Sequence, residues 1–315
     1  MGWVPWTLLA IVSATAGLVG AALYSHAKVS ELEARYPPLG EFHRHPAGRL
    51  HYIDRGAGKA ILLVHGANTS ARDFEASIAP LLSRKYRVVA IDRPGYGYSD
   101  RWPRSHQPSR QADALQAVVA ALGLDKPVIV GHSLGGAISL AYALKYPNQV
   151  GGLVLLGGVA FPWSTGVDWH YHVASWPVVG PLFTNALVLP VGQRLLPAGV
   201  KQVFSPNAAP SDYLERTGLM LALRPKAYLS SARDLLHLSE AMAIQSRDYE
   251  RITQPVLLIT GSGDEIVAAW NHSERLVKVL PQATLRILSD VGHAPHHTLP
   301  TEIARAISEF VDDSP

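Results

Sequence analysis

One serine in this chain stands in a pattern that could carry covalent chemistry. Ser133 lies in the segment 131–136, which reads Gly-His-Ser-Leu-Gly-Gly, between an apolar run at 127–130 and a helix-like segment at 137–144. A serine on a sharp turn between a strand and a helix takes a strained backbone conformation, and the flanking glycines leave room for it. The pattern is that of a nucleophile elbow. A glycine-rich turn without chemistry would explain the same glycines, so the interpretation depends on partner residues.

Two further residues could activate the Ser133 hydroxyl. A serine hydroxyl is a poor nucleophile until a base takes its proton, and a histidine base works best when a carboxylate orients it. Asp264 follows the apolar run 256–260, and His293 comes a few residues after the run 284–288. Both lie just past the carboxyl end of an expected strand, where catalytic groups gather in open α/β sheets. The sequence therefore predicts acyl transfer by a serine, a histidine and an aspartate.

Strand-like and helix-like segments alternate along most of the chain, which is typical of an α/β protein with a mostly parallel sheet. Residues 161–250 break the alternation with helix-like segments rich in Trp, Leu, Pro and Ala, and we expect an inserted helical cap there. The core is then formed by residues 40–160 and 251–315. The expected strands are 49–54, 60–64, 86–91, 127–130, 152–156, 256–260 and 284–288, and the clearest helices are 111–122 and 301–311.

Residues 1–26 are expected to be a single-pass membrane anchor. No residue from Gly2 to Tyr24 is charged, and a bilayer core takes about 20 apolar residues to cross. A cleaved signal peptide is the alternative, but a basic start is missing and the apolar run is too long. Lys28 and Arg35 follow the span, which favours the following side as cytoplasmic, although a long folded domain can override this bias. Residues 27–39 are expected to form a polar stalk.

Residues 40–313 resemble the α/β-hydrolase-fold serine hydrolases, whose catalytic residues follow the chain order Ser, Asp, His. The resemblance implies an α/β-hydrolase fold in which helices flank the sheet. It also implies that Ser133 is the nucleophile, that His293 is the general base and then the general acid, and that Asp264 orients the histidine. His132, inside the elbow, is expected to pack under the nucleophile.

Neighbouring acids and histidines are given other roles. Glu265 or Asp290 could replace Asp264, but Asp264 occupies a Gly-x-Gly-Asp position that is similar to that of the family's acid. Glu265 is then a loop carboxylate, and Asp290 is a capping or turn residue. His296 and His297 follow a proline and are expected at the surface or at the rim of the site.

The tetrahedral intermediate of acyl transfer needs two N–H donors for its oxyanion, and the loss of one costs about 2.7–4 kcal/mol of barrier stabilisation. The elbow supplies one donor through the backbone of Leu134. The segment 65–68, His-Gly-Ala-Asn, resembles the family's oxyanion loop. That resemblance assigns the second donor to the backbone of Ala67.

Residues 92–101 resemble the loop after the fourth strand of epoxide hydrolases and haloalkane dehalogenases. Those enzymes use an aspartate where this chain has Ser133, and the dehalogenases have a tryptophan where it has Leu134. An aspartate nucleophile forms an alkyl ester, whereas a serine forms an acyl-enzyme. We therefore treat this loop as structural and favour acyl transfer.

Composition excludes several other classes of protein. The net charge is +3 and the cations are scattered, so nucleic-acid binding is not indicated. The chain has no cysteine, which excludes disulfides, thiol catalysis and Cys-based metal sites, and it has no His-Glu-x-x-His motif. We expect neither a cofactor nor a metal ion.

The leading hypothesis is a membrane-bound carboxylesterase or lipase-like serine hydrolase that acts on lipid-like or other apolar acyl esters. The cap's Trp, Leu and Val content suggests an apolar pocket, and the anchor would hold that pocket near lipid-derived molecules. A C–C bond hydrolase or a cofactor-free perhydrolase with the same three residues is an alternative, and so is a non-catalytic scaffold of the same fold. The oligomeric state and the side of the membrane are left open.

Overall fold

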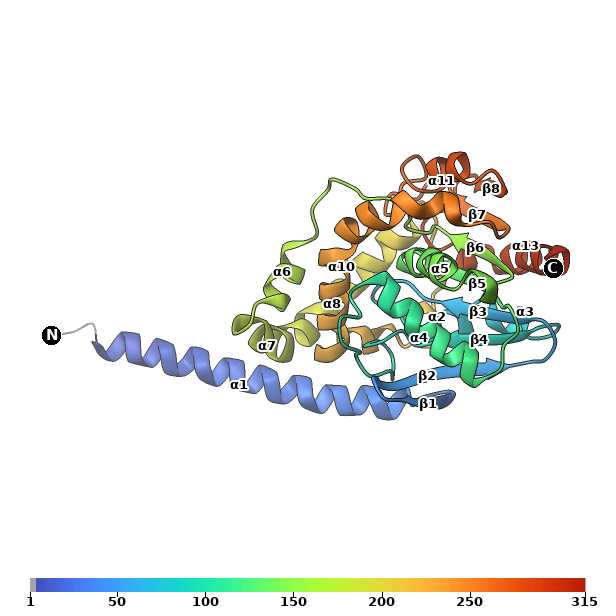
Figure 1. Cartoon of the computed structure of the whole chain (residues 1–315). Coiled ribbons are helices and arrows are strands. Elements are labelled where there is room, and N and C mark those ends of the chain that lie inside the picture. Colours follow the sequence, from blue (N-terminus) through green and yellow to red (C-terminus); the bar gives the residue numbers. More distant parts are fainter. Residues whose placement is uncertain (1–3, 315) are drawn as a thin grey trace.

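The computed structural model describes residues 4–314, in which an eight-stranded sheet forms the centre of the molecule (Figure 1). The strand order is β1-β2-β4-β3-β5-β6-β7-β8, and only the pairings of β1 with β2 and of β2 with β4 are antiparallel. The strands are β1 Glu41–His45, β2 Gly48–Arg55, β3 Ala60–Val64, β4 Arg87–Ile91, β5 Val128–His132, β6 Gly152–Leu156, β7 Val256–Gly261 and β8 Ala283–Leu288.

Helices α4 and α5 pack on one face of the sheet, and helices α2, α3 and α13 pack on the other. The helices of the described residues are α1 Val4–Arg35, α2 Arg72–Glu75, α3 Ala79–Leu82, α4 Pro108–Ala121, α5 Leu134–Lys145, α6 Trp169–Ser175, α7 Val179–Phe183, α8 Leu189–Phe204, α9 Tyr213–Thr217, α10 Pro225–Gln245, α11 Ser273–Val279, α12 Pro295–Thr298 and α13 Pro300–Asp313. Short 3₁₀ or π segments are η1 Pro147–Gln149, η2 Thr184–Val188, η3 Leu219–Leu223 and η4 Ser246–Arg251.

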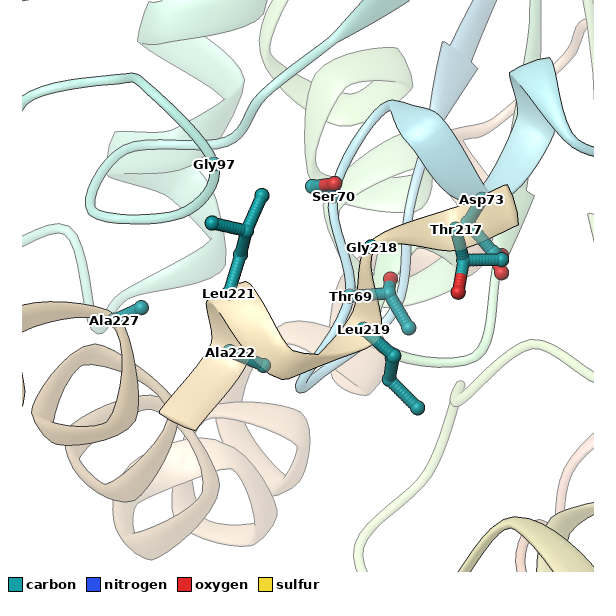
Figure 2. A pocket seen from close by; sticks show the side chains of 10 residues that line it. All are labelled: Thr69, Ser70, Asp73, Gly97, Thr217, Gly218, Leu219, Leu221, Ala222 and Ala227. Carbon is teal, nitrogen blue, oxygen red and sulfur yellow. The ribbon is translucent and has the colours of Figure 1, made fainter. Parts of the chain in front are cut away.

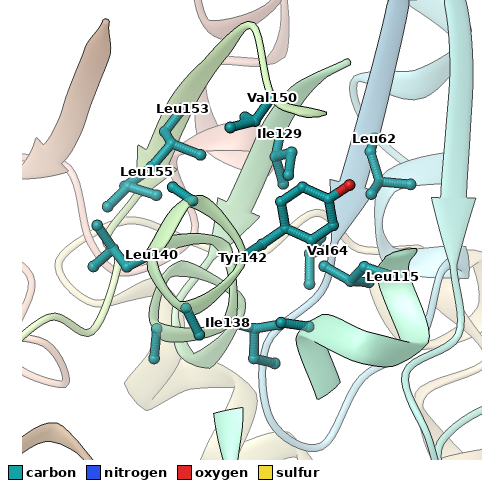
Figure 3. Close-up of a cluster of buried hydrophobic side chains, with 14 of the residues drawn as sticks. Leu62, Val64, Leu115, Ile129, Ile138, Leu140, Tyr142, Val150, Leu153 and Leu155 are labelled. Carbon is teal, nitrogen blue, oxygen red and sulfur yellow. The ribbon is translucent and has the colours of Figure 1, made fainter. Parts of the chain in front are cut away.

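The hydrophobic core is split between the two faces of the sheet. One cluster joins the sheet to α4 and α5, and the other joins it to α2, α3 and α13. Tyr142 of α5 lies in the first cluster, where its ring is surrounded by aliphatic side chains from the sheet and α4 (Figure 3), while its hydroxyl donates to Gln116 Oε1 at 3.2 Å. Because β5 and β6 are buried on both faces, they are continuous apolar runs in the sequence and do not alternate.

The expected architecture, a mostly parallel sheet flanked by helices, is confirmed. The expected strands are all present, with ends that shift by one or two residues. Strand β1 was not expected. Its residues are mostly exposed at the sheet edge, so the segment carries no apolar pattern that would indicate a strand.

Residues 161–250, called the helical segment below, are connected to the sheet by a buried ionic network that involves the loop at 92–101. Arg93 Nη1 donates to Gln111 Oε1 at 2.7 Å and lies 3.2 Å from Asp234 Oδ2 on α10. The Tyr96 hydroxyl donates to the same carboxylate at 2.9 Å, and Arg101 Nη2 lies 2.7 Å from its other oxygen. The polar side chains of this loop therefore position α10.

Helix α1 runs without a break through both the expected anchor and the expected stalk. Its most apolar stretch has a mean hydropathy of 1.8 and none of that stretch is buried, so the helix is long and apolar enough to cross a membrane. The polar end is docked: Leu32 packs with Leu189 and Leu221, and Arg35 pairs with Glu215 at 2.8 Å. Residues 27–35 are thus helical and contact the helical segment, and the division into anchor, stalk, core and cap remains a proposal.

Candidate active site

Ser133 occupies the turn between β5 and α5 in a strained conformation, with φ 54° and ψ −121°. A non-glycine residue with positive φ costs on the order of 1–3 kcal/mol and persists only where its surroundings hold it. The Ser133 N–H donates to Leu156 O at 3.0 Å, and its carbonyl accepts from Gly136 and Val159, both at 2.9 Å. These three bonds fix the turn, and the Ser133 side chain is half-buried between buried neighbours.

The glycine after the elbow is required by close packing. A Cβ on Gly135 would lie 2.1 Å from Val64 O, so the first turn of α5 can approach β3 only without a side chain at this position. A Cβ on Gly66 would lie 3.0 Å from Ser133 Cβ, which places the loop after β3 directly beside the serine.

His293 and Asp264 are hydrogen-bonded to each other. His293 Nδ1 lies 2.8 Å from Asp264 Oδ2, and both side chains are buried. The other carboxylate oxygen accepts the N–H groups of Ile266 at 3.0 Å and Val267 at 2.8 Å. An ionised Asp264 accepts from Nδ1–H, which leaves Nε2 as the basic nitrogen of His293. Neither Glu265, which is exposed, nor Asp290, which has φ 57° in a turn, takes this place.

Gly157 lies between Ser133 and the His293–Asp264 pair. It follows Leu156, which accepts the Ser133 N–H, and it has φ +50°. A Cβ at this position would lie 3.0 Å from Asp264 Oδ2 and 3.2 Å from His293 Nδ1. The ends of β5, β6, β7 and β8 therefore bring Ser133, Asp264 and His293 to one edge of the sheet.

Replacing Gly157 with alanine is expected to lower kcat by about 10- to 100-fold, because a shift of roughly 1 Å in a catalytic group costs that much. The added Cβ would push against the Asp264 carboxylate and strain a backbone with positive φ. The measurement is steady-state hydrolysis of an activated ester, alongside the melting temperature.

Gly166→Ala is the matched control for Gly157→Ala, because a Cβ there meets nothing within 4 Å. Full activity in Gly157→Ala would show that the packing around Asp264 does not set its position.

The two expected oxyanion donors belong to segments next to Ser133: Leu134 follows it in the chain, and Ala67 follows Gly66, which lies directly beside it. Leu134 is the first residue of α5, so its N–H has no acceptor within the helix. Within residues 4–314, neither this N–H nor that of Ala67 makes a hydrogen bond. Both groups are thus available to an oxyanion.

Two hydrogen bonds to the Gly66 carbonyl set the direction of the Ala67 N–H. That oxygen lies 2.7 Å from Arg93 Nη2 and 2.8 Å from His65 Nδ1. Burial and the neighbouring Arg93 charge lower the pKa of His65 to about 3, so the ring is neutral. The Nε2 of His65 accepts the backbone N–H of Arg93 at 3.1 Å. The ring proton is therefore on Nδ1, which donates to the Gly66 carbonyl. Because a trans peptide points its C=O and N–H in opposite directions, holding the one aims the other.

The helical segment contributes to the loop after β3 in a way the sequence did not reveal. Asn68 has φ 56°, its N–H donates to Ser231 Oγ of α10 at 3.3 Å, and its Nδ2 donates to the Tyr171 hydroxyl of α6 at 2.9 Å. Tyr171 in turn stacks on Tyr228, with ring centroids 5.6 Å apart. The asparagine directly after His-Gly-Ala could have indicated a polar contact of this loop. Its partners could not be identified from the sequence, because they lie more than 100 residues away.

The expectation that His296 and His297 lie at the surface or the rim is wrong. Both are buried, and each Nε2 lies 2.9 Å from an oxygen of Asp73 on α2. Burial alone would raise the pKa of Asp73, but the two imidazoles hold it well below its usual range. Sequence spacing could not reveal this contact, because Asp73 is more than 220 residues away from both histidines. His132, as expected, is buried beneath the elbow, and its Nε2 lies 2.9 Å from the His293 carbonyl.

Asp73, His296 and His297 are also the described residues that could hold a metal ion, since one ligand atom from each lies within 4.8 Å of the others. Hydrogen bonding already accounts for their arrangement, because the carboxylate accepts from both rings and from the Tyr213 hydroxyl at 3.3 Å. We assign no metal to this cluster.

A small cavity lies between the loop after β3 and the helical segment (Figure 2). It is lined by Thr69, Ser70, Leu221, Ala227 and others, and its volume of about 10 Å³ matches roughly one water molecule. Its lining includes neither Ser133 nor His293. The cavity is therefore a packing gap beside the site and not a substrate pocket.

A serine on a strained turn next to a buried His–Asp pair, above a mostly parallel sheet, defines the class of α/β hydrolases. The model of the alpha/beta hydrolase fold family matches residues 59–300, and the chain belongs to this family. It is a hydrolase with a small-molecule substrate.

Proteins similar to this chain carry the names of different hydrolases. A 2-hydroxy-6-oxononadienedioate/2-hydroxy-6-oxononatrienedioate hydrolase of Cupriavidus pinatubonensis is 31% identical over 78% of this chain and 84% of its own length. A hydrolase of the same name from Dechloromonas aromatica is 29% identical over 84% of this chain and 90% of its own length. Among solved structures, an esterase from Exiguobacterium antarcticum is similar, with a TM-score of 0.70 at 21% identity, covering 87% of this chain and all of that one.

Proposed function

We propose that this chain is a membrane-bound serine hydrolase that cleaves carboxylic esters with an apolar acyl group. The observation that carries the proposal is the position of Ser133 on a strained turn, with the hydrogen-bonded pair of His293 and Asp264 at the same edge of the sheet. This arrangement is suited to nucleophilic catalysis through an acyl-enzyme.

In the proposed first half of the reaction, His293 Nε2 takes the proton of the Ser133 hydroxyl while Oγ attacks the ester carbonyl carbon. The backbone N–H groups of Ala67 and Leu134 donate to the oxyanion of the tetrahedral intermediate. His293 then gives its proton to the leaving alcohol, and the acyl group remains on Ser133. Asp264 holds the ring in the required tautomer and stabilises the imidazolium.

In the second half, a water molecule takes the place of the alcohol. His293 accepts a proton from this water, whose oxygen attacks the acyl-enzyme carbonyl. The second tetrahedral intermediate collapses, the carboxylic acid leaves, and His293 returns the proton to Ser133 Oγ. No cofactor is needed in either half.

A C–C bond hydrolase is the second candidate, and it is favoured by the names of the curated relatives. Those names denote dicarboxylate substrates, which would need positive charge in the pocket. In this chain the buried Arg93 shares the Asp234 carboxylate with Arg101. Arg194 and Lys201 are the only Lys or Arg residues from 169 to 211. The apolar character of this segment and of α1 supports esters as the substrate.

The purified full chain in mild detergent is expected to hydrolyse p-nitrophenyl esters, with kcat/KM rising from the acetate to medium-chain esters. Each methylene buried in an apolar pocket contributes about 0.8 kcal/mol, or roughly fourfold. A vinylogous diketone and an ester with added peroxide are tested in parallel. Cleavage of the diketone without cleavage of esters would replace ester hydrolysis with C–C hydrolysis, and peroxide-dependent peracid formation as the main reaction would indicate a perhydrolase.

A further inference from the structure

Exposed apolar side chains gather on one part of the helical segment. Eight of the fourteen exposed large hydrophobic side chains outside α1 that the structure describes fall between residues 169 and 195. Val178 is the most exposed, at 84%. We call this group the cap face, and its members are Trp169, Trp176, Val178, Val179, Leu182, Leu187, Val191 and Leu195. An apolar patch of this kind on a soluble surface marks an interaction site.

The cap face lies beside the point where α1 leaves the folded body. α1 packs along η2 and α8, and Gln193 Nε2 donates to the Tyr24 hydroxyl at 2.9 Å. In Figure 1 the N-terminal part of α1 projects past α6 and α7 into open space. The 20 residues from Val4 to Leu23 rise about 30 Å, which is the thickness of a bilayer core. A bilayer crossed by this segment therefore ends near Tyr24, at the level of α8.

The charges of the residues around the cap face also match a lipid surface. Residues 169–211 contain no Asp or Glu, and their Lys and Arg residues are Arg194 and Lys201. Lys28, the first charged residue after the apolar part of α1, is one turn beyond Tyr24. A surface that combines tryptophans and aliphatic side chains with sparse cations and no acids is typical of the membrane interface. A protein partner would not need to exclude acidic residues over such a length.

We propose that the cap face is immersed in the interfacial region of the same bilayer that α1 crosses. The inference rests on the membrane anchoring put forward as part of the proposed function. It gives the cap a second role, because α6 carries Tyr171, whose hydroxyl accepts a hydrogen bond from Asn68 Nδ2 beside the oxyanion loop. An ester that partitions into the bilayer thus meets the part of the cap that contacts the active site.

The absence of cysteine makes the test direct, since a single introduced cysteine is the only labelling site. Val178→Cys in the full chain is labelled with a nitrobenzoxadiazole fluorophore and reconstituted into vesicles of phosphatidylcholine and phosphatidylglycerol. Nitroxide groups on the lipid headgroup or upper acyl chain are then added as quenchers. We expect strong quenching of the Val178 label, with an emission shift to shorter wavelength.

Two label positions calibrate this experiment. Leu9→Cys reports on the proposed span, and Arg305→Cys, on α13, reports on the end of the molecule opposite to the projecting N-terminal part of α1 (Figure 1). Quenching of the Leu9 and Val178 labels but not of the Arg305 label supports the proposal. Quenching of the Leu9 label alone overturns the immersion of the cap face and leaves the anchor intact, and quenching of neither overturns both.

A charge variant separates docking from catalysis. Val178→Glu is expected to lower hydrolysis of a long-chain ester presented in vesicles by about tenfold, the factor that corresponds to losing the burial of one valine side chain. Hydrolysis of water-soluble p-nitrophenyl acetate by the same preparation is expected to stay unchanged. Equal rates of wild type and Val178→Glu on the vesicle substrate would contradict the immersion of the cap face. A wild-type protein that does not hydrolyse p-nitrophenyl acetate would instead contradict the proposed ester hydrolysis.

Discussion

Replacing Ser133 with alanine is expected to reduce kcat for ester hydrolysis by a factor of about 10⁴ to 10⁶, the range found when a catalytic serine is removed. Alanine keeps the Cβ and accepts the same backbone strain, so the turn and its three hydrogen bonds remain. KM and the melting temperature are therefore expected to change little. The measurement is turnover of an activated ester, with fluorophosphonate labelling of the folded protein as an independent readout of the nucleophile.

The neighbouring carboxylates provide a matched pair for this prediction. Asp264→Asn removes the charge that orients His293, and it is expected to lower kcat by up to about 10⁴-fold. Glu265→Gln changes the next residue along the chain, which is exposed, and is expected to leave kcat unchanged. Residual activity in Ser133→Ala above a tenth of wild type, or no labelling of folded wild-type protein, would favour another nucleophile or a non-catalytic scaffold.

Local patterns in the sequence predict the sheet and the turn that carries Ser133. The buried strands are continuous apolar runs, and the spacing of glycines around the serine reflects contacts made within a few residues or with the neighbouring strand, such as that of Gly135 with Val64. The positions of Asp264 and His293 follow from the same logic, because the carboxyl ends of adjacent parallel strands meet at one edge. Fold class and the meeting of these groups could therefore be predicted.

Contacts between distant segments could not be predicted. The Gly66 carbonyl is held by a hydrogen bond from Arg93, and the Asn68 side chain is held by a hydrogen bond to Tyr171 of α6. Neither contact can be predicted from the spacing of residues in the loop itself. The two histidines after Pro295 look like surface residues because no carboxylate is near them in the sequence. Only the folded sheet brings Asp73 to them.

The helical nature of residues 27–35 was hidden for a similar reason. The segment is polar and ends before two prolines, which is typical of a linker. Its few apolar side chains, Val29 and Leu32, lie on one face and pack against the helical segment, and the ion pair of Glu33 with Arg224 at 2.7 Å adds to this contact. Tertiary packing therefore decides the structure of this part of the chain.

Acidification from pH 7 to pH 5 is expected to destabilise the folded protein by on the order of 3–6 kcal/mol, through three buried histidines that stay neutral in the folded state. Burial is the main cause in each case: it lowers the pKa of His65 to about 3, that of His272 to about 4, and that of His132 well below its usual value. In the unfolded chain these rings take up protons near pH 6.5.

The sign of this effect follows from proton binding. Between pH 6.5 and about 4, the unfolded chain binds more protons than the folded protein at these three positions, so the free energy of unfolding falls as the pH falls. Burial also lowers the pKa of His296, which acts in the same direction. The lowered pKa values of Asp73 and Asp92 stabilise the folded protein fully at pH 5 and above. This contribution is lost only below about pH 4, where unfolded carboxyl groups take up protons, so it does not change the loss between pH 7 and pH 5.

The measurement is the free energy of unfolding, or the melting temperature, of the full chain in a mild non-ionic detergent across this pH range. His272→Gln keeps an acceptor for the N–H groups of Ala160 and Phe161, which His272 Nδ1 accepts at 3.1 and 3.2 Å, but removes the titration. It is expected to reduce the pH slope by about 1.4 kcal/mol per pH unit, which corresponds to one proton. A wild-type protein equally stable at pH 5 and pH 7 would mean that these rings are protonated in the folded state. His65 could then no longer accept the Arg93 N–H while donating to Gly66, and the direction of the Ala67 N–H would need another cause.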